Sequence, residues 1–484
     1  MSLDAPRLAP NPDSTNPDST SPDSTSPDST RHDPTHPTEP TGATDPARPN
    51  NQTEFSAAAS SGVAPHSRLP RMFAALSVPN YRIWMAGAFV SNIGTWMQRV
   101  AQDWFVLELT HGSGVAVGIT TALQFLPMLL LSPVGGLVAD RFAKRSVLKV
   151  TQLWLAACAA LLGVLAVTGV AQTWQVYVCA FLFGVGTAFD NPARQSFVSE
   201  VVGGPLLPNA IALNSATFHG ARIIGPAVAG LVIAAFGSGW AILSNSVTYA
   251  AFIVALICMN PALLQPPPLI RKAKRQIRQA VSYVRGRPDV LLVLLVAFSV
   301  GTFGMNFQLT SALMAQQEFH RGPEQYGILG TFMAVGSLAG ALIAARRTSA
   351  PSGRYVVVVA MIFGALEIAS GLMPTYWAFA ASLPALGLAT LLTLTASNAS
   401  VQMGVDPALR GRVMALYAMV LMGGTPVGAP VIGWIGQTFG PRWTLLGGGA
   451  LTLVGVSLAA LWLLPRVTTP PAAPVPASVQ EARA

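Results

Sequence analysis

Charged side chains are scarce in this chain of 484 residues: they make up 10% of it, whereas apolar residues make up 51%. Much of that charge lies outside the long apolar runs, so a soluble globular domain would lack a polar surface. The runs have the length of a transmembrane helix, about 20 residues, and lack the ten-residue alternation of a membrane β-barrel. The sequence therefore predicts an all-α membrane protein.

Cysteine and enzyme motifs are also scarce. The three cysteines, Cys158, Cys179 and Cys258, fall in apolar segments with no framework spacing, which predicts free buried thiols. The sequence has no Walker-type phosphate loop, no H-E-x-x-H, no nucleophile elbow in context and no clustered metal ligands. We therefore expect neither an enzyme nor a cofactor or metal site.

The positive charge has a particular distribution. The formal net charge is +9, and the cations collect in the connections between apolar segments. This pattern is typical of signals that orient membrane helices, so no nucleic-acid partner is expected. With both termini in the cytoplasm, only Arg321 and Arg442 among the basic residues of the connections fall outside. The distribution predicts a multi-pass protein of the bacterial inner membrane with both termini cytoplasmic.

The apolar segments predict twelve helices, six on each side of a long basic connection. Their expected ranges are 81–107, 115–139, 147–170, 174–190, 209–235, 240–260, 290–313, 326–345, 355–373, 376–397, 412–435 and 442–464. The predicted organisation is a six-helix bundle over 71–260, a basic cytoplasmic linker over 261–289 and a second bundle over 290–464. Within the linker, residues 275–284 predict an amphipathic helix on the inner headgroups, or else a solvated basic segment.

The two ends of the chain have a different composition. Residues 1–70 carry a repeated Pro-Asp-Ser-Thr unit and further Pro, Thr and Asp, and residues 465–484 are rich in proline. Such segments bury too little apolar surface to offset chain entropy, so both are predicted to be disordered tails. The first also lacks the basic and apolar regions of a cleavable signal peptide.

The two halves share sequence features in the same order. Asn191 and Gln195 are expected to open the connection after the fourth helix, with the spacing of Asn398 and Gln402 after the tenth. Glycine and proline interrupt the fifth helix (Gly225, Pro226, Gly230) and the eleventh (Gly423, Gly424, Pro426, Gly428, Pro430). Repeats with interrupted helices at matching places are typical of alternating-access transporters.

One short segment carries the strongest motif. Residues 136–145 read G-x-x-x-D-R-x-x-K-R and join two long apolar segments, so they predict a tight cytoplasmic hinge loop. The gating residues expected there are Gly136, Asp140, Arg141, Lys144 and Arg145. The segment resembles the signature loop of the major facilitator superfamily, although Ala143 stands where that family usually has glycine. The resemblance implies that Asp140 contacts the cytoplasmic end of the eleventh helix and helps to close an inner gate.

Three further parts of the chain resemble the bacterial drug and siderophore exporters of the enterobactin-exporter type: residues 95–99 with 104–110, residues 190–195 and residues 410–413. The arginines beside Asp140 and at the start of the eleventh helix make a cytoplasmic charge latch available. The contact between the bundles is expected to involve Asp190, Arg194, Arg410 and Arg412.

Charges inside the predicted helices are expensive and are therefore candidate functional residues. Arg99 and Asp103 are four residues apart on the first helix, which predicts either a titrating pair or a structural ion pair at the outer rim. Glu367 is expected either to pack in its protonated form or to couple protons, and His219 either to pack or to titrate. Arg222, with Gly225, Pro226 and Gly230, lies in either a cavity or a structural pair.

Together these features predict a monomeric secondary transporter with two six-helix bundles around a central cavity. Its expected activity is proton-coupled export of small amphipathic organic molecules. A polar, catechol-like cargo that uses Arg222 and Arg99 as ligands, as in a siderophore or secondary-metabolite exporter, is the alternative within the class. Outside it, a lipid-handling protein or a membrane scaffold is the other interpretation.

Overall fold

The computed structural model describes residues 71–265, 276–347, 349–407 and 409–467. Nearly all of the two predicted tails lies outside these ranges, as residues 1–70 and 468–484. The basic linker residues 266–275 also lie outside them. The predictions for these segments stay predictions.

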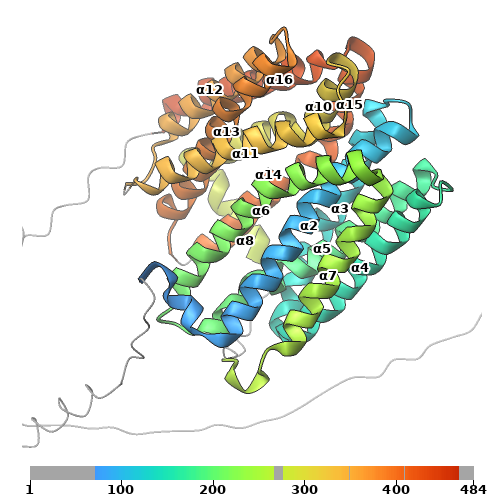
Figure 1. Ribbon diagram of the computed structural model, residues 1–484. Helices are drawn as coiled ribbons and strands as arrows, with labels where there is room; N and C mark the ends of the chain where they lie inside the picture. Colours follow the sequence, from blue (N-terminus) through green and yellow to red (C-terminus); the bar gives the residue numbers. More distant parts are fainter. Residues whose placement is uncertain (1–70, 266–275, 348, 408, 468–484) are drawn as a thin grey trace, which may run out of the picture. The chain divides into compact units, whose positions relative to one another are not determined.

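The first half of the described chain is a series of long helices (Figure 1). In order they are η1 (Arg71–Ser77), α2 (Pro79–Leu109), α3 (Gly114–Arg141), α4 (Lys144–Val167), α5 (Thr173–Val202), α6 (Leu207–Phe236) and α7 (Ser238–Cys258). Helices α3 and α5, α4 and α7, and α2 with α6 and α7 pack against one another. We refer to α2–α7 as the first half.

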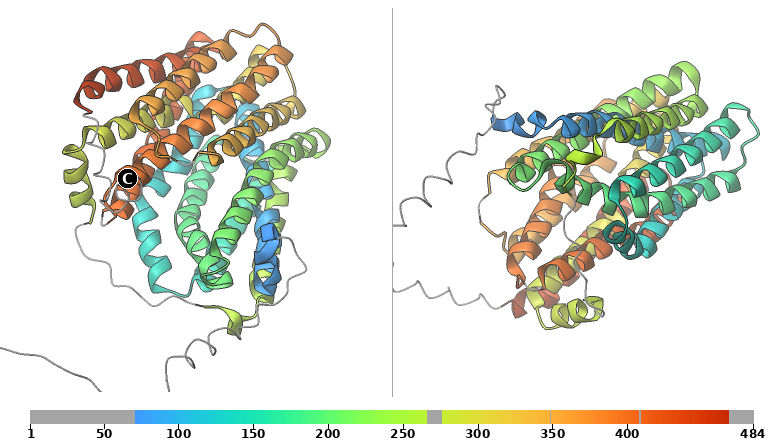
Figure 2. Two further views of the ribbon diagram at one scale, coloured as in Figure 1. Left: turned by 90° about the vertical axis from the view of Figure 1, so that its left-hand side faces the viewer. Right: turned by 90° about the horizontal axis from the view of Figure 1, so that it is seen from below.

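The second half follows a 3-10 turn, η2 (Pro261–Leu263), and the short helix α8 (Gln276–Arg285). It contains α9 (Pro288–Ser299), η3 (Val300–Gly304), α10 (Phe307–Leu313), η4 (Met314–Glu318), α11 (Pro323–Ala345), α12 (Gly353–Gly371), α13 (Tyr376–Gly404), α14 (Arg410–Gly423), α15 (Thr425–Phe439), α16 (Arg442–Leu463) and η5 (Leu464–Arg466). Here α11 packs on α13, and α12 packs on α13 and α16 (Figure 2). We refer to α9–α16 as the second half.

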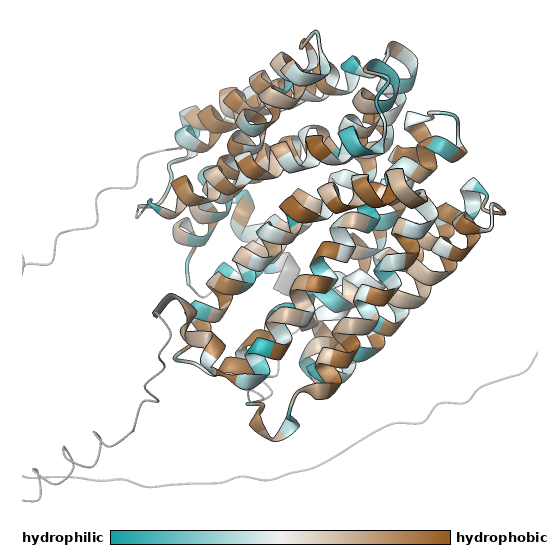
Figure 3. Cartoon of the chain, in the orientation of Figure 1, coloured by the Kyte–Doolittle hydropathy of each residue, from teal (hydrophilic) through white to brown (hydrophobic). Residues whose placement is uncertain are grey.

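Ten helical segments among the described residues are long and apolar enough to cross a membrane. Apolar residues run along their lengths (Figure 3), and large apolar side chains such as Leu130, Val150, Leu231, Val247 and Leu461 are exposed. Such an apolar outer surface suits lipid and not water. The remaining long helices, α2 and α5, have 31 and 30 residues and carry charged side chains within their length. The chain is therefore a multi-pass membrane protein.

Several helix boundaries differ from the sequence prediction. Helix α5 runs to Val202 and not to residue 190, so Asn191 and Gln195 are helical and do not open a connection. Helix α13 likewise continues to Gly404, past Asn398 and Gln402. Pro192 lies inside α5, because neighbouring helices and side chains can satisfy the backbone groups that a proline frees.

The predicted hinge loop is much shorter than its motif. Helix α3 continues to Arg141 and α4 begins at Lys144, so only Phe142 and Ala143 connect the two helices. The backbone of Ala143 has φ −57° and ψ 114°, a conformation open to any L-residue. Alanine therefore fits here without strain in place of the usual glycine.

The two halves meet closely at one end of the molecule. There, Gly114–Gly118 of α3 faces Ala429–Gly433 of α15, and Pro226–Gly230 of α6 faces Pro323–Gly327 of α11. A Cβ atom on Gly118 would lie 2.5 Å from the Ala429 carbonyl oxygen, and one on Gly327 would lie 2.4 Å from that of Pro226. Glycine thus allows backbone-to-backbone contact between the halves. We call this region the contact end.

The opposite end carries the basic connections. Helices α3 and α11 both begin at the contact end, so their last residues, Arg141 and Ala345, mark the other one. Lys144, Arg346 and Arg347 lie there as well. We call this region the basic end.

Candidate substrate site and gate

Two arginines flank one tryptophan between α2 and α6. The guanidinium carbon of Arg99 lies 5.0 Å from the centroid of the Trp96 ring, and that of Arg222 lies 5.4 Å from it. Arg99 also lies 5.6 Å from the ring of Phe125 on α3. Both distances to the indole are within the range of a cation–π contact. We call Trp96, Arg99 and Arg222 the arginine–tryptophan site.

The local sequence explains how this site is assembled. Trp96 and Arg99 are three residues apart and so lie on one face of α2. A Cβ atom on Gly225 would lie 2.5 Å from Cβ of Trp96, so glycine lets α6 approach α2 beside the indole. Arg222 lies one turn before this glycine. The predicted glycine motif of the fifth helix thus has two packing roles: Gly225 packs on α2, whereas Pro226 and Gly230 face α11.

The two cations at this site repel each other. Their distances to the shared indole place the guanidinium carbons at most about 10.4 Å apart, which corresponds to a repulsion of at least about 1.6 kcal/mol at an effective dielectric constant of about 20. Both side chains are half-buried, and Nε of Arg99 is buried without a hydrogen-bond partner. An arrangement of this kind is unfavourable without an anion.

Asp103 lies near this site. The sequence predicts that it pairs with Arg99, but the contacts of the described residues include no ion pair between the two. Its carboxylate lies 3.5 Å from the hydroxyl of Tyr326 on α11, and this hydroxyl also donates to the Gln308 carbonyl at 3.2 Å. The Tyr326 ring stacks on Trp104 with a centroid distance of 5.9 Å. Asp103 is only 7% exposed. It therefore lies between the two halves, near the contact end.

His219 connects the arginine–tryptophan site with a cavity of about 590 Å³. The Phe218 ring makes edge contacts with Trp96 at 5.9 Å and with His219 at 5.7 Å. His219 then lines the cavity together with residues of α11, α12 and α13. The charged residues of the cavity wall are Arg346 and Arg347, with no acidic residue among the described lining. The cavity thus joins both halves and has a positive wall.

Glu367 lies apart from these groups, inside the second half. Its side chain is 4% exposed and its Oε2 atom has no hydrogen-bond partner. A Cβ atom on Gly304 would lie 3.2 Å from Oε2, and one on Gly448 would lie 3.0 Å from Oε1. The carboxyl group is therefore enclosed by η3 and α16, away from the cavity. This placement is compatible with the packing role and leaves the coupling role open.

The predicted gating residues lie at the end of α3 and the start of α4, at the basic end. Lys144 forms an ion pair with Glu200 of α5. Arg145 donates to the Leu256, Ile257 and Met259 carbonyls at the end of α7, at 2.7 to 3.0 Å. These contacts tie the start of α4 to α5 and α7 of the first half. Gly136 has open space around it.

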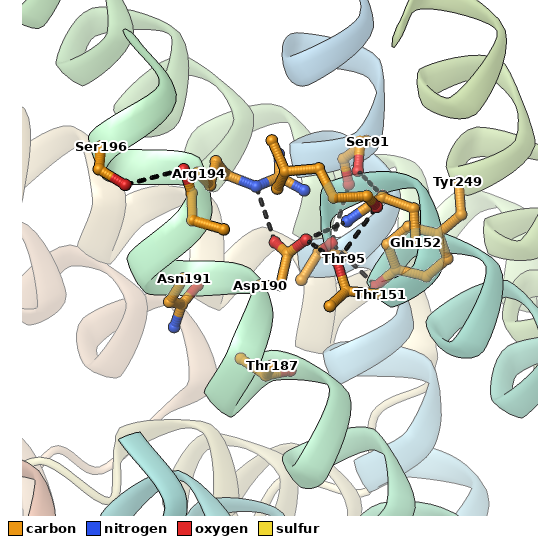
Figure 4. Close-up of polar contacts among 12 residues, drawn as sticks. Ser91, Thr95, Thr151, Gln152, Thr187, Asp190, Asn191, Arg194, Ser196 and Tyr249 are labelled. Atoms are coloured by element: carbon orange, nitrogen blue, oxygen red, sulfur yellow. Dashed lines mark hydrogen bonds and ion pairs between the residues drawn. The ribbon is translucent and has the colours of Figure 1, made fainter. Parts of the chain in front are cut away.

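Asp190 and Arg194 belong to a buried network inside the first half (Figure 4). The Asp190 carboxylate accepts hydrogen bonds from Thr151 and Gln152, both at 2.8 Å, and from Arg194 at 2.9 Å. The guanidinium of Arg194 lies 4.5 Å from the ring of Phe252 on α7. These contacts join α4, α5 and α7, whereas the sequence placed both residues at the contact between the bundles.

Sequence reasoning missed the polar partners of this network. Gln152 also accepts from Ser91 at 3.5 Å, and the hydroxyls of Thr95 and Tyr249 lie 3.1 Å apart. Thr151 and Gln152 lie where the apolar part of α4 begins, and polar residues inside a predicted membrane helix were the available signal.

Arg410 and Arg412 begin α14, at the basic end of the second half. Arg412 donates to the Gln279 side chain of α8 at 2.5 Å. Ala280 and Val284 of α8 are buried, so this helix packs on the protein. Arg287, two residues after the end of α8, pairs with Asp289 at 2.7 Å, and hydrogen bonding to that carboxylate raises the pKa of Arg287. The linker helix is thus anchored to α14 and α9.

The cysteines lie apart from all these groups. All three are free; Cys158 and Cys179 are buried, whereas Cys258 is exposed, unlike the prediction. It is the last residue of α7, where the helix leaves the packed interior.

Comparison with known proteins places these features in context. Residues 71–480 match the family described as "Transmembrane secretion effector". The chain is 24% identical to the staphyloferrin A transporter of Staphylococcus aureus over 54% of this chain and 66% of that protein. It is also 24% identical to macrolide efflux protein A of Streptococcus pyogenes, over 78% and 94% of the two chains. The enterobactin exporter EntS of Citrobacter koseri is 23% identical over 82% and 95%.

Solved structures support the fold. The nucleoside transporter NupG matches with a TM-score of 0.62 at 11% identity, over 79% of this chain and 98% of that one. A D-xylose-proton symporter matches with a TM-score of 0.60 at 11% identity, over 78% and 96%.

Proposed function

Because the chain belongs to the transmembrane secretion effector family of the major facilitator superfamily, we propose that it exports small amphipathic organic molecules by alternating access. Membership of this family confirms the resemblance that the hinge and exporter segments carry in the sequence. The proposed setting is the inner membrane of a bacterium. Family and neighbours are transporters and not enzymes.

The proposed architecture has twelve transmembrane helices in two bundles of six. The segments Pro288–Glu318 and Arg410–Phe439 each count as one crossing, although both are interrupted. Helices α2 and α5 count as crossings by their length. Both termini and the basic end then face the cytoplasm, in accordance with the excess of lysine and arginine there.

One observation carries the transport proposal. The halves are in backbone contact at the contact end, whereas a cavity lined by α6 from the first half and α11–α13 from the second lies toward the basic end. A transporter that is closed outside and accessible from the cytoplasm has this arrangement. Export then requires the glycine contacts to separate while the basic end closes.

The gate of the basic end is proposed to use the cluster around the end of α3. Asp140 is the acid of a segment with three cations, and Arg410 and Arg412 begin α14 on the other half. Closure would bring these charges together. Lys144 and Arg145 are anchored to α5 and α7, so they hold the segment in place while the halves move.

Proton coupling is proposed for Asp103. Its carboxylate lies between the halves against Tyr326, so separation at the contact end changes its surroundings. A proton that the Asp103 carboxylate takes up from outside would neutralise the carboxylate. Release of this proton into the cytoplasm would restore the negative charge. Two other residues are alternatives for the coupling role. Glu367 is enclosed in the second half, and His219 faces the cavity.

A panel of compounds tests the proposal. The accumulation of each compound is measured in a pump-deficient bacterial host that carries the wild-type chain, the empty vector or Asp140→Asn, with equal membrane expression of the two proteins. Lower accumulation of at least one amphipathic compound with the wild-type chain is expected. If no compound differs from the empty vector while the protein is inserted, a lipid-handling or scaffold role is favoured.

A further inference from the structure

We propose that the arginine–tryptophan site binds an anionic group, in the first place a carboxylate, of the transported molecule. This inference rests on the proposed export function and specifies its substrate class. The site supplies two cations and an indole face, and the molecule would supply the missing negative charge.

The first step is the absence of an internal counter-ion. The guanidinium groups of Arg99 and Arg222 lie against aromatic rings. Among the described residues, no carboxylate lies within 4.0 Å of either group. The nearest acid along α2 is Asp103, and its carboxylate contacts Tyr326. Two half-buried like charges that no carboxylate contacts are unfavourable, so an anion that arrives from elsewhere would be bound favourably beside them.

The second step is that four other acids already have partners, and that Glu367 is enclosed by η3 and α16. Glu200 pairs with Lys144, Asp190 with Arg194, and Glu318 with Arg442. Glu108 accepts hydrogen bonds from Trp104 and Ser238 near the contact end. These acids lie in other parts of the protein and hold other donors.

The third step is access. His219 lies one turn before Arg222 on α6 and lines the cavity, and Phe218 contacts both His219 and Trp96. Both arginines are half-buried and so are partly accessible. The cavity wall offers Arg346 and Arg347 and no described acid, so its field attracts anions and repels cations on the way to the site.

The fourth step is the match in shape. A guanidinium is a planar fork that binds a carboxylate through two parallel hydrogen bonds. Beside it, Trp96 and Phe125 offer aromatic faces for an apolar or ring-shaped body. The structure therefore fits an amphipathic carboxylate better than a neutral or cationic compound.

Direct binding tests this inference without relying on transport. Purified protein in phosphatidylcholine nanodiscs is titrated with 2-naphthoate and with its neutral amide, 2-naphthamide, which have the same ring system. We expect the carboxylate to bind at least about tenfold more tightly, because hydrogen bonds to a charged group are stronger than neutral ones. Arg222→Gln and Arg99→Gln should each bring the two affinities close together.

Two controls keep the test sharp. Arg222→Lys keeps the charge without the fork and should retain part of the preference, which separates binding from misfolding. Arg82→Gln changes a residue of α2 that is far from the site, so it should leave the preference for the carboxylate over the amide unchanged. Equal affinities of acid and amide in the wild-type protein would overturn the inference, as would a preference that survives both glutamine variants. If phosphatidylglycerol in the nanodiscs abolishes naphthoate binding, the site is one for lipid headgroups and the inference is wrong.

The export proposal can fail separately. Efflux of neutral or cationic compounds alone would refute the anion site and leave export intact. A carboxylate preference in the purified protein together with no efflux of any compound would refute export and leave the site intact.

Discussion

Substitution of Gly118 by alanine is expected to open the contact end. The added Cβ atom would lie 2.5 Å from the Ala429 carbonyl oxygen and 2.9 Å from Cα of Pro430. Real Cβ contacts start at 3.0 Å, so α3 and α15 must separate by at least 0.5 Å, and both nearby atoms are backbone and cannot rotate away. Overpacking of this kind costs about 1–3 kcal/mol. The ratio of the open to the closed contact end should therefore rise by about 5- to 150-fold.

Gly136 provides a matched control on the same helix. A Cβ atom there would meet nothing within 4 Å. Gly136→Ala therefore brings the same gain in helix propensity, about 1 kcal/mol, without the clash. A difference between the two variants then reports the contact between the halves and not the stability of α3.

Distances between spin labels measure the effect in a background without the native cysteines. One pair, at His111 and Thr438, spans the contact end, and the other pair, at Gly204 and Ala350, spans the basic end; all four residues are exposed. In Gly118→Ala we expect longer distances at the first pair and shorter ones at the second, whereas Gly136→Ala should match the wild type. Unchanged distributions in Gly118→Ala would refute the assignment of this contact as a closed gate.

Three further substitutions test individual charges. Asp140→Asn should leave membrane insertion intact and sharply lower efflux, because the acid of the proposed gate is lost; efflux at the wild-type rate and equal expression would exclude the gating role. Asp103→Asn should abolish uphill export in response to a pH gradient but spare exchange, since an amide cannot take up and release a proton; retained gradient-driven export would move the coupling role to Glu367 or His219. Asp190→Ala should lower the free energy of unfolding by about 3–5 kcal/mol, because Arg194, whose side chain is only 17% exposed, would lose its ion pair; a melting temperature equal to that of the wild type would show that this network is dispensable.

The positions of the helices were predictable because membrane helices follow hydropathy. Every predicted segment corresponds to a helical segment in the structure, and boundaries such as Gly114 and Arg442 lie close to the expected ones. The end of α5 was not predictable in this way. Its last turns carry Asp190, Arg194 and Glu200, which read as a loop in sequence. In the structure Thr151, Gln152 and Lys144 satisfy these charges, so a polar segment stays helical.

The site was predictable in its members but not in its contacts. Arg99 and Arg222 were identified from their cost inside apolar helices, yet sequence spacing paired Arg99 with Asp103 on the same helix. The shared neighbour is Trp96, and the contact that joins the two arginines depends on the approach of α6 at Gly225. Contacts between distant helices depend on packing, which periodicity within one helix does not contain.

Uptake into inverted membrane vesicles tests the central claim most directly. The compound that shows the largest efflux effect in the host is offered to vesicles whose interior has been made acidic, with wild-type protein, with Asp140→Asn, or without the chain. Transport from the cytoplasmic face, coupled to protons, predicts accumulation in wild-type vesicles that collapses on addition of a protonophore and is strongly reduced in the variant. Accumulation that is equal in all three preparations, or that ignores the pH gradient, would contradict proton-coupled export by this chain.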